Sequence, residues 1–136
     1  MIELNLMIDH VSLSVENLER AKAFYSKALS PLGLALVAEL SAEQTGSVAM
    51  LGFGVGRKSS FWVAERGRQT PNAHICFRAR SRAAVQAFHD AALRGGAQDH
   101  GGPGTRPKYH SAYYAAFVLS PEGHNIEAVC FKDEPD

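Results

Sequence analysis

The sequence has 136 residues, a mass of 14.7 kDa, 46% hydrophobic and 21% charged residues, which is typical of a globular protein with one core. Fourteen basic residues balance fourteen acidic ones, so we expect neither a nucleic acid nor a membrane surface as partner. No apolar run is long enough to span a membrane, and the first residues lack the basic region of a secretory signal. Two cysteines make no disulfide framework, so we expect a reduced, cytoplasmic protein with Cys76 and Cys130 buried as small hydrophobic residues.

The first half predicts a strand, a helix and three further strands. Residues 8–15 alternate polar and apolar side chains, which is typical of a half-buried strand. Asn17 is a good N-cap for the apolar helical stripe that follows, and Pro31 and Gly33 end that helix. The three strands after it are expected over residues 34–40, 46–54 and 59–65.

The second half repeats this order. Residues 73–79 predict a strand, Ser81 caps the next helix, and Gly95 ends it. The glycine-rich stretch 101–107 predicts a loop. The last two strands are separated by a turn signal and are expected over residues 112–119 and 124–131.

A shift of the chain by 64 residues aligns the two halves. The shift matches several pairs in the same order: His10 with His74, Asn17 with Ser81, Phe24 with Phe88 and Leu29 with Leu93. We therefore predict one domain made of two modules, residues 1–68 and 69–136, joined near residues 70–72.

The fold class predicted from this pattern is α+β, with two tandem βαβββ modules forming curved mixed sheets around a concave groove. One helix covers only one face of a four-stranded sheet. The uncovered faces must therefore curl together or meet a second chain. For this reason we expect a homodimer, with or without exchanged modules.

Three residues on the faces turned away from the helices predict a metal site. His10 and His74 occupy equivalent positions in the two modules. Glu127 lies between two apolar residues of the last strand, where a charge is costly to bury unless it is paired or coordinated. Two histidines and one carboxylate suit a divalent ion such as Zn, Ni, Mn or Fe. On spacing alone, the alternatives are hydrogen-bonded core histidines and a glutamate that is solvated or paired with an arginine.

Five motifs bear on the family of the chain: Ile8-Asp9-His10-Val11, Asn17-Leu18-Glu19-Arg20-Ala21 continuing to Phe24-Tyr25, Gly33-Leu34, His74-Ile75-Cys76-Phe77, and Pro121-Glu122-Gly123-His124-Asn125-Ile126-Glu127. Together they resemble the vicinal-oxygen-chelate superfamily, which includes glyoxalase I, fosfomycin- and bleomycin-resistance proteins and extradiol dioxygenases. The resemblance spans roughly residues 5–132. It implies paired βαβββ modules, and metal ligands His10, His74 and Glu127 on the first, fifth and eighth strands.

The resemblance leaves the reaction open, because function depends on the site rather than on the fold. Members like glyoxalase I use a fourth ligand, a glutamate on the fourth strand. Subtracting 64 from Glu127 leads to Val63, and Glu65 would serve only after a shift of register. A missing second carboxylate counts against isomerisation, in which that glutamate moves the proton. It favours a three-ligand site like that of the fosfomycin thiol transferases and extradiol dioxygenases.

The segment 105–111 is expected to form a loop that closes over the groove. Arg106 and Lys108 are candidates for binding an anionic substrate. Tyr109 and His110 are candidate proton donors and, with the ligand glutamate, the candidate catalytic residues. The alternative for this segment is a solvated loop with one packed tyrosine.

The remaining aromatic residues and histidines are expected to be structural. Trp62 lines the core or the groove, and in the groove it would contact the substrate. Packing in the sheet or a place on the surface or in a turn is expected for Tyr113, Tyr114, His89, His100 and His124.

These features together predict a metal-dependent enzyme that acts on a small substrate with vicinal oxygens, as a lyase, thiol transferase or dioxygenase. A metal-free protein that sequesters an aromatic or cationic ligand, like the bleomycin-resistance proteins, is the alternative. It would use the same groove, with Trp62, Phe53 and the tyrosines as its walls.

Overall fold

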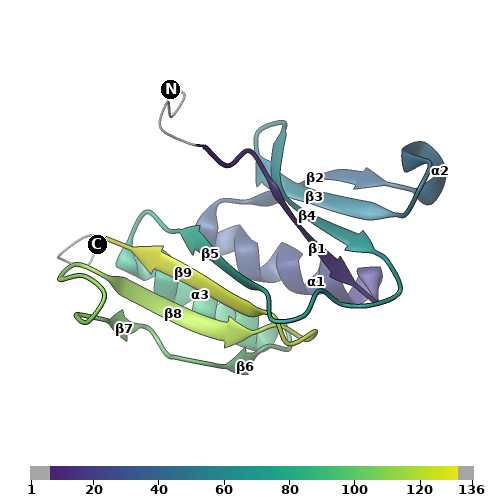
Figure 1. Ribbon diagram of the computed structural model, residues 1–136. Coiled ribbons are helices and arrows are strands. Elements are labelled where there is room, and N and C mark those ends of the chain that lie inside the picture. The colour runs from purple at the N-terminus through teal and green to yellow at the C-terminus, as the bar shows by residue number, and fades with distance from the viewer. Residues whose placement is uncertain (1–6, 132–136) are drawn as a thin grey trace.

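The computed structural model describes residues 7–131 (Figure 1). The first half forms β1 (Val11–Val15), α1 (Leu18–Leu29), the 3-10 helix η1 (Ser30–Leu32), β2 (Ala35–Leu40), α2 (Ala42–Thr45), β3 (Met50–Val55) and β4 (Lys58–Glu65). The second half forms β5 (His74–Arg78), α3 (Arg82–Arg94), β6 (Gln98–Asp99), β7 (Gly104–Thr105), β8 (Tyr114–Leu119) and β9 (Asn125–Cys130). Within residues 7–131, no helix combines the length and apolar character needed to cross a bilayer.

Each half builds one mixed sheet. The first sheet has the order β1-β4-β3-β2, and the second has the order β5-β9-β8-β6, with β7 also paired to β8. In both sheets the first strand runs parallel to the last strand of its half, and the other pairs are antiparallel. The predicted α+β class with two curved mixed sheets is therefore confirmed. The predicted module boundary, between residues 68 and 69, lies in the connection from β4 to β5.

The two long helices start at the caps that the sequence predicts. The side chain of Asn17 accepts a hydrogen bond from the backbone N of Arg20 at 2.9 Å, and Ser81 Oγ accepts one from Ala84 N at 3.0 Å. These bonds satisfy backbone donors that have no partner inside a helix. Gly33, at φ +87°, follows η1 in the left-handed conformation, which a glycine adopts without strain.

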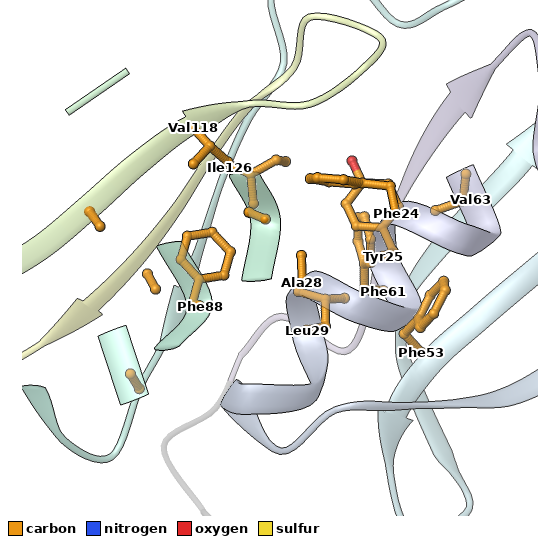
Figure 2. Packing of buried hydrophobic residues seen from close by; sticks show 14 of the residues in the cluster. Phe24, Tyr25, Ala28, Leu29, Phe53, Phe61, Val63, Phe88, Val118 and Ile126 are labelled. Atoms are coloured by element: carbon orange, nitrogen blue, oxygen red, sulfur yellow. The ribbon is translucent and has the colours of Figure 1, made fainter. Parts of the chain in front are cut away.

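The core is shared between the halves. Figure 2 shows side chains of α1 and the first sheet beside side chains of α3 and the second sheet: Phe24, Tyr25, Phe53, Phe61 and Val63 on one side, Phe88, Val118 and Ile126 on the other, with Ala28 and Leu29 between them. The ring of Tyr25 lies 5.0 Å from that of Phe61. Burial of each large apolar side chain contributes about 1.5–3 kcal/mol to stability. Separating the halves would expose many of these side chains to water, and much of this stabilisation would be lost.

One short helix lies between two strands where the sequence analysis predicts none. The strand expected from residue 46 begins only at Met50, and α2 precedes it. Ser41 and Gln44 form a capping box, in which Ser41 Oγ accepts from Gln44 N and Gln44 Oε1 accepts from Ser41 N. A serine followed three residues later by a glutamine is a helix-start signal, and the search for alternating strand residues overlooks it here.

Two short strands lie where the sequence predicts none. β6 and β7 each have two residues, and both pair with β8. The expectation of a loop over 101–107 is therefore wrong at Gly104 and Thr105. Two residues are too few for an alternating pattern, so long-range pairing decides these strands.

Polar contacts join the two halves close to the connection from β4 to β5. Arg20 Nε donates to Glu122 Oε2 at 3.0 Å, and the Glu122 side chain is fully buried. His124 is also buried, and its Nε2 lies 2.8 Å from the carbonyl oxygen of Thr70. The expectation of a surface position for His124 is thus wrong, because its ring is buried between the modules, although its backbone closes the turn that begins at Ser120. Gln69 Nε2 donates to the carbonyl oxygen of Glu122 at 3.0 Å.

We predict that Arg20→Gln lowers the free energy of unfolding by about 2 kcal/mol, because it leaves the buried Glu122 carboxylate without its cation. The loss is smaller than for a wholly buried pair because Arg20 is half exposed. Urea unfolding measures the difference. Arg94→Gln is the matched control, since Arg94 and Asp90 form an exposed pair one helical turn apart. That control is expected to cost about 0.5 kcal/mol or less. Equal losses in the two variants would show that the Arg20 contact has no special importance.

Candidate functional site

Glu127 is a buried carboxylate on the sheet face opposite the helices. It is 2% exposed, and β9 directs it toward β5, where it pairs in register with Cys76. Its Oε1 lies 2.9 Å from His74 Nε2, and its Oε2 accepts a hydrogen bond from the Tyr113 hydroxyl. Both carboxylate oxygens are therefore engaged by side chains of this face.

Tyr113 is a residue of this site that sequence reasoning assigns to packing. Burial, together with the hydrogen bond to Glu127, raises the pKa of its hydroxyl, so the group stays protonated and donates. Phe117 pairs with Glu127 across the sheet, and Tyr113 lies four residues earlier on the same face. The alternation of side chains between the two faces of a strand is therefore the sequence signal that could have placed Tyr113 beside Glu127.

Cys76 lies on the same face as His74 and is exposed, whereas Cys130 is buried. The expectation of burial is thus confirmed for Cys130 and wrong for Cys76, because alternate residues of β5 face opposite sides. Although the residue as a whole is exposed, its sulfur atom is partly desolvated, and this, followed by the Glu127 charge beside it, raises the pKa of the Cys76 thiol to about 12. The thiol is therefore protonated at neutral pH.

His10 immediately precedes β1, and its side chain is about half exposed. Its Nδ1 lies 2.7 Å from Asp9 Oδ2, which also accepts a hydrogen bond from Lys58 Nζ at 2.6 Å. Lys58, and then His10, hold the pKa of the Asp9 carboxyl below its usual value. A carboxylate on one ring nitrogen orients a histidine so that the other nitrogen faces a ligand.

The two histidines border one cavity of about 410 Å³, whose wall includes His10, His74 and Cys76. Among residues 7–131, however, no three His, Cys, Asp or Glu side chains come close enough to hold a metal ion. The structure thus brings His74 and Glu127 together and leaves His10 apart from that pair within one chain.

The position that corresponds to Glu127 in the first module is Trp62. Cys76 pairs with Glu127, and Ser12, the counterpart of Cys76, pairs with Trp62. The second module is one residue longer between these strands, so the assignment of Val63 from a constant shift of 64 is wrong. Glu65 lies three residues further along, and its carboxylate accepts a hydrogen bond from the backbone N of Leu18 at 3.2 Å.

Two of the candidate loop residues, Tyr109 and His110, have different surroundings. Tyr109 lines a second cavity, of about 370 Å³, together with His74, Tyr113, Phe117 and Glu127. His110 Nδ1 accepts a hydrogen bond from Ala112 N at 2.9 Å, so the neutral ring carries its proton on Nε2.

Arg106 and Lys108 each stand over an aromatic ring of this cavity. The Arg106 guanidinium carbon is 5.5 Å from the centre of the Phe117 ring, and Lys108 Nζ is 5.2 Å from that of Tyr109. Arg106 Nη2 also donates to the carbonyl oxygen of Gly102 at 2.8 Å, which fixes the direction of its side chain.

We predict that iodoacetamide modifies Cys76 slowly at neutral pH in protein kept free of metal by a chelator, because only the thiolate reacts. The rate is expected to rise well beyond pH 9. Glu127→Gln removes the charge that raises the thiol pKa, so it should speed the reaction at pH 8 by at least about tenfold, which corresponds to one pKa unit. Peptide mass spectrometry measures the rate, and buried Cys130 reports any unfolding. A rate that levels off near pH 9 in both proteins would contradict the assigned environment of Cys76.

Comparisons with known proteins agree with this fold. The family model described as Glyoxalase/Bleomycin resistance protein/Dioxygenase superfamily matches residues 7–128. A glyoxalase/bleomycin resistance protein from Albidiferax ferrireducens is 26% identical, with a TM-score of 0.73 and coverage of 90% of this chain and 96% of that one. A comparison with curated proteins finds no match.

Two further structures share the fold. Lactoylglutathione lyase from Agrobacterium tumefaciens is 19% identical, with a TM-score of 0.64 and coverage of 94% of this chain and 96% of that one. Glyoxalase I from Zea mays is 19% identical, with a TM-score of 0.68, and the match covers 92% of this chain but 46% of the maize chain. Since the family model spans nearly all of the described residues, the chain belongs to the Glyoxalase/Bleomycin resistance protein/Dioxygenase superfamily.

Proposed function

We propose that this protein is a metal-dependent enzyme that acts on a small substrate with vicinal oxygens. The observation that carries the proposal is the Glu127 carboxylate, buried on the uncovered face of the second sheet with His74 Nε2 at 2.9 Å. Such a pair of nitrogen and oxygen donors suits Zn, Ni, Mn or Fe.

The spacing of the two donor atoms fits a shared ion. Bonds of about 2.1 Å at right angles place two ligand atoms about 3.0 Å apart, close to the observed separation. The hydroxyl of Tyr113 holds the other carboxylate oxygen, which is how an outer hydrogen bond orients a ligand. A bound divalent ion would supply Lewis acidity to the substrate's vicinal oxygens.

The third ligand of the proposed site is His10 of a second copy of the chain. Within the described part of one chain, His10 does not join His74 and Glu127 in a group of ligands. Its Nδ1 contacts Asp9, so Nε2 is the atom that would bind. A symmetric homodimer would bring each His10 to the other copy's pair and form two equal sites.

The proposed reaction is one that needs no second protein carboxylate at the metal. Trp62 occupies the place that corresponds to Glu127 in the first module. This supports thiol transfer or dioxygenation over isomerisation, in which a ligand glutamate moves a proton. Tyr109, on the wall of the cavity, and His110, with its proton on Nε2, are the candidate proton donors to the substrate.

We predict that protein purified without a histidine tag holds about one divalent ion per chain, and that His74→Ala loses it. Elemental analysis at neutral pH measures the content. His89→Ala is the matched control, since His89 bonds to Asp99 at 2.9 Å on α3 and should leave the content unchanged. If wild-type protein holds no stoichiometric metal, the enzyme proposal fails and a metal-free binding protein takes its place.

A second prediction tests the shared site. His10→Ala and His74→Ala are each expected to bind no metal, but a mixture of the two, unfolded and refolded together, should regain about a quarter of the wild-type sites. Half of the random dimers are mixed, and each mixed dimer has one intact site out of two. If the mixture regains no metal binding, the site does not lie between two copies.

A further inference from the structure

The cavity beside Glu127 has an aromatic wall. Its volume is about 370 Å³, and His74, Tyr109, Tyr113 and Phe117 line it with the glutamate. The ring centres of Tyr109 and Tyr113 are 5.1 Å apart, and those of His74 and Phe117 are 6.3 Å apart. A cavity of this size takes a small molecule, and a wall of rings favours a flat, unsaturated one.

Two cations belong to this wall. Arg106 stands over Phe117, and Lys108 stands over Tyr109. Within residues 7–131, neither of them forms an ion pair with a carboxylate. The bond from Arg106 to the carbonyl oxygen of Gly102 helps to hold its guanidinium near the Phe117 ring without neutralising it.

A third cation extends the same surface. The ring of Phe131 lies 5.3 Å from that of Tyr113, and the guanidinium carbon of Arg78 lies 4.8 Å from the centre of the Phe131 ring. Arg78 belongs to β5 and is on the face that carries His74. Cations thus border the aromatic surface from β5 as well as from the loop.

The single carboxylate of this wall does not offset these charges for a ligand. Glu127 is 2% exposed, and His74 and Tyr113 engage its two oxygens. A cationic ligand would meet three like charges and no accessible carboxylate. An anionic ligand would instead meet positively charged hydrogen-bond donors. The aromatic rings beside them have a low dielectric constant, so they weaken this attraction less than water does.

We propose that the ligand of this cavity is a small planar aromatic anion. Its ring would stack on Tyr109 and Phe117, and its carboxylate or similar anionic group would face Arg106. This deepens the proposed function and rests on it for the place of the reacting oxygens. The aromatic wall and the cations bind without a metal, so the two ideas are tested separately.

The test is calorimetry on the chelator-treated 136-residue protein with three probes of similar size: phenylacetate, cyclohexylacetate and phenethylamine. Phenylacetate should bind about fivefold more tightly than cyclohexylacetate, which lacks the ring. It should bind at least about tenfold more tightly than phenethylamine, whose charge is reversed, and added salt should weaken its binding.

Variants separate the two parts of the wall. Arg106→Gln should weaken phenylacetate binding about fivefold. Arg94→Gln should leave it unchanged, because Arg94 lies on α3 and pairs with Asp90. Tyr109→Leu, at an exposed position where folding is not at risk, should bring the two carboxylates to similar affinity.

Several results would overturn the inference: no phenylacetate binding at millimolar concentration, equal binding of cyclohexylacetate, tighter binding of phenethylamine, or the same loss in Arg94→Gln as in Arg106→Gln. Protein that holds metal but shows no preference among the probes would retain the enzyme proposal and reject this ligand class. Protein that holds no metal yet prefers phenylacetate would reject the metal enzyme and retain the ligand class.

Discussion

Each sheet of this protein has two faces, and one long helix per half covers only one of them. The core follows from this constraint, since α1 and α3 pack against the sheets and bury the apolar side chains of alternate strand positions. In β1, Leu13 and Val15 are buried while Ser12 is exposed. In β5, His74 and Cys76 are exposed. The uncovered faces are therefore free to carry polar side chains that the core would exclude.

Glu127 departs from this division, because it lies on the uncovered face and is nevertheless buried. Taking a carboxylate out of water costs several kcal/mol, and hydrogen bonds from neighbours do little more than offset that cost. Tyr113 and His74 provide such bonds. An apolar residue at this position would serve stability as well or better. The arrangement is thus better explained by a need for a positioned carboxylate than by a need for stability.

Local patterns predicted much of the fold. The period of two assigned the faces of β1 and β5, and the caps Asn17 and Ser81 placed the starts of both long helices. These features depend on residues that are close in sequence. The repeat also identified His10 and His74 as equivalent, because the two histidines fall on matching positions when the halves are aligned.

The errors come from interactions between distant residues. Pairing with β8 creates β6 and β7, which have no periodic signal of their own. The joint between the modules buries His124, although its neighbours in sequence form a turn. One added residue changes the counterpart of Glu127 from Val63 to Trp62, and only the strand register reveals this. For the same reason, the amino-acid sequence predicts which residue types form the site better than it predicts which of them lie close together in space.

The two modules differ on the uncovered faces of their sheets. His74 faces a buried glutamate on the neighbouring strand, while His10, its counterpart, contacts the exposed Asp9, and Trp62 replaces the glutamate. A fully symmetric pair of modules would place carboxylates on both sheets. Here the second module alone keeps the histidine and glutamate pair, together with the aromatic wall and its cations. Because the net charge of the chain is zero, the attraction of the proposed anionic ligand would have to come from this local cluster. Under the proposed function, each chain would therefore contribute one half-site of His74 and Glu127, and His10 of a second copy would complete it.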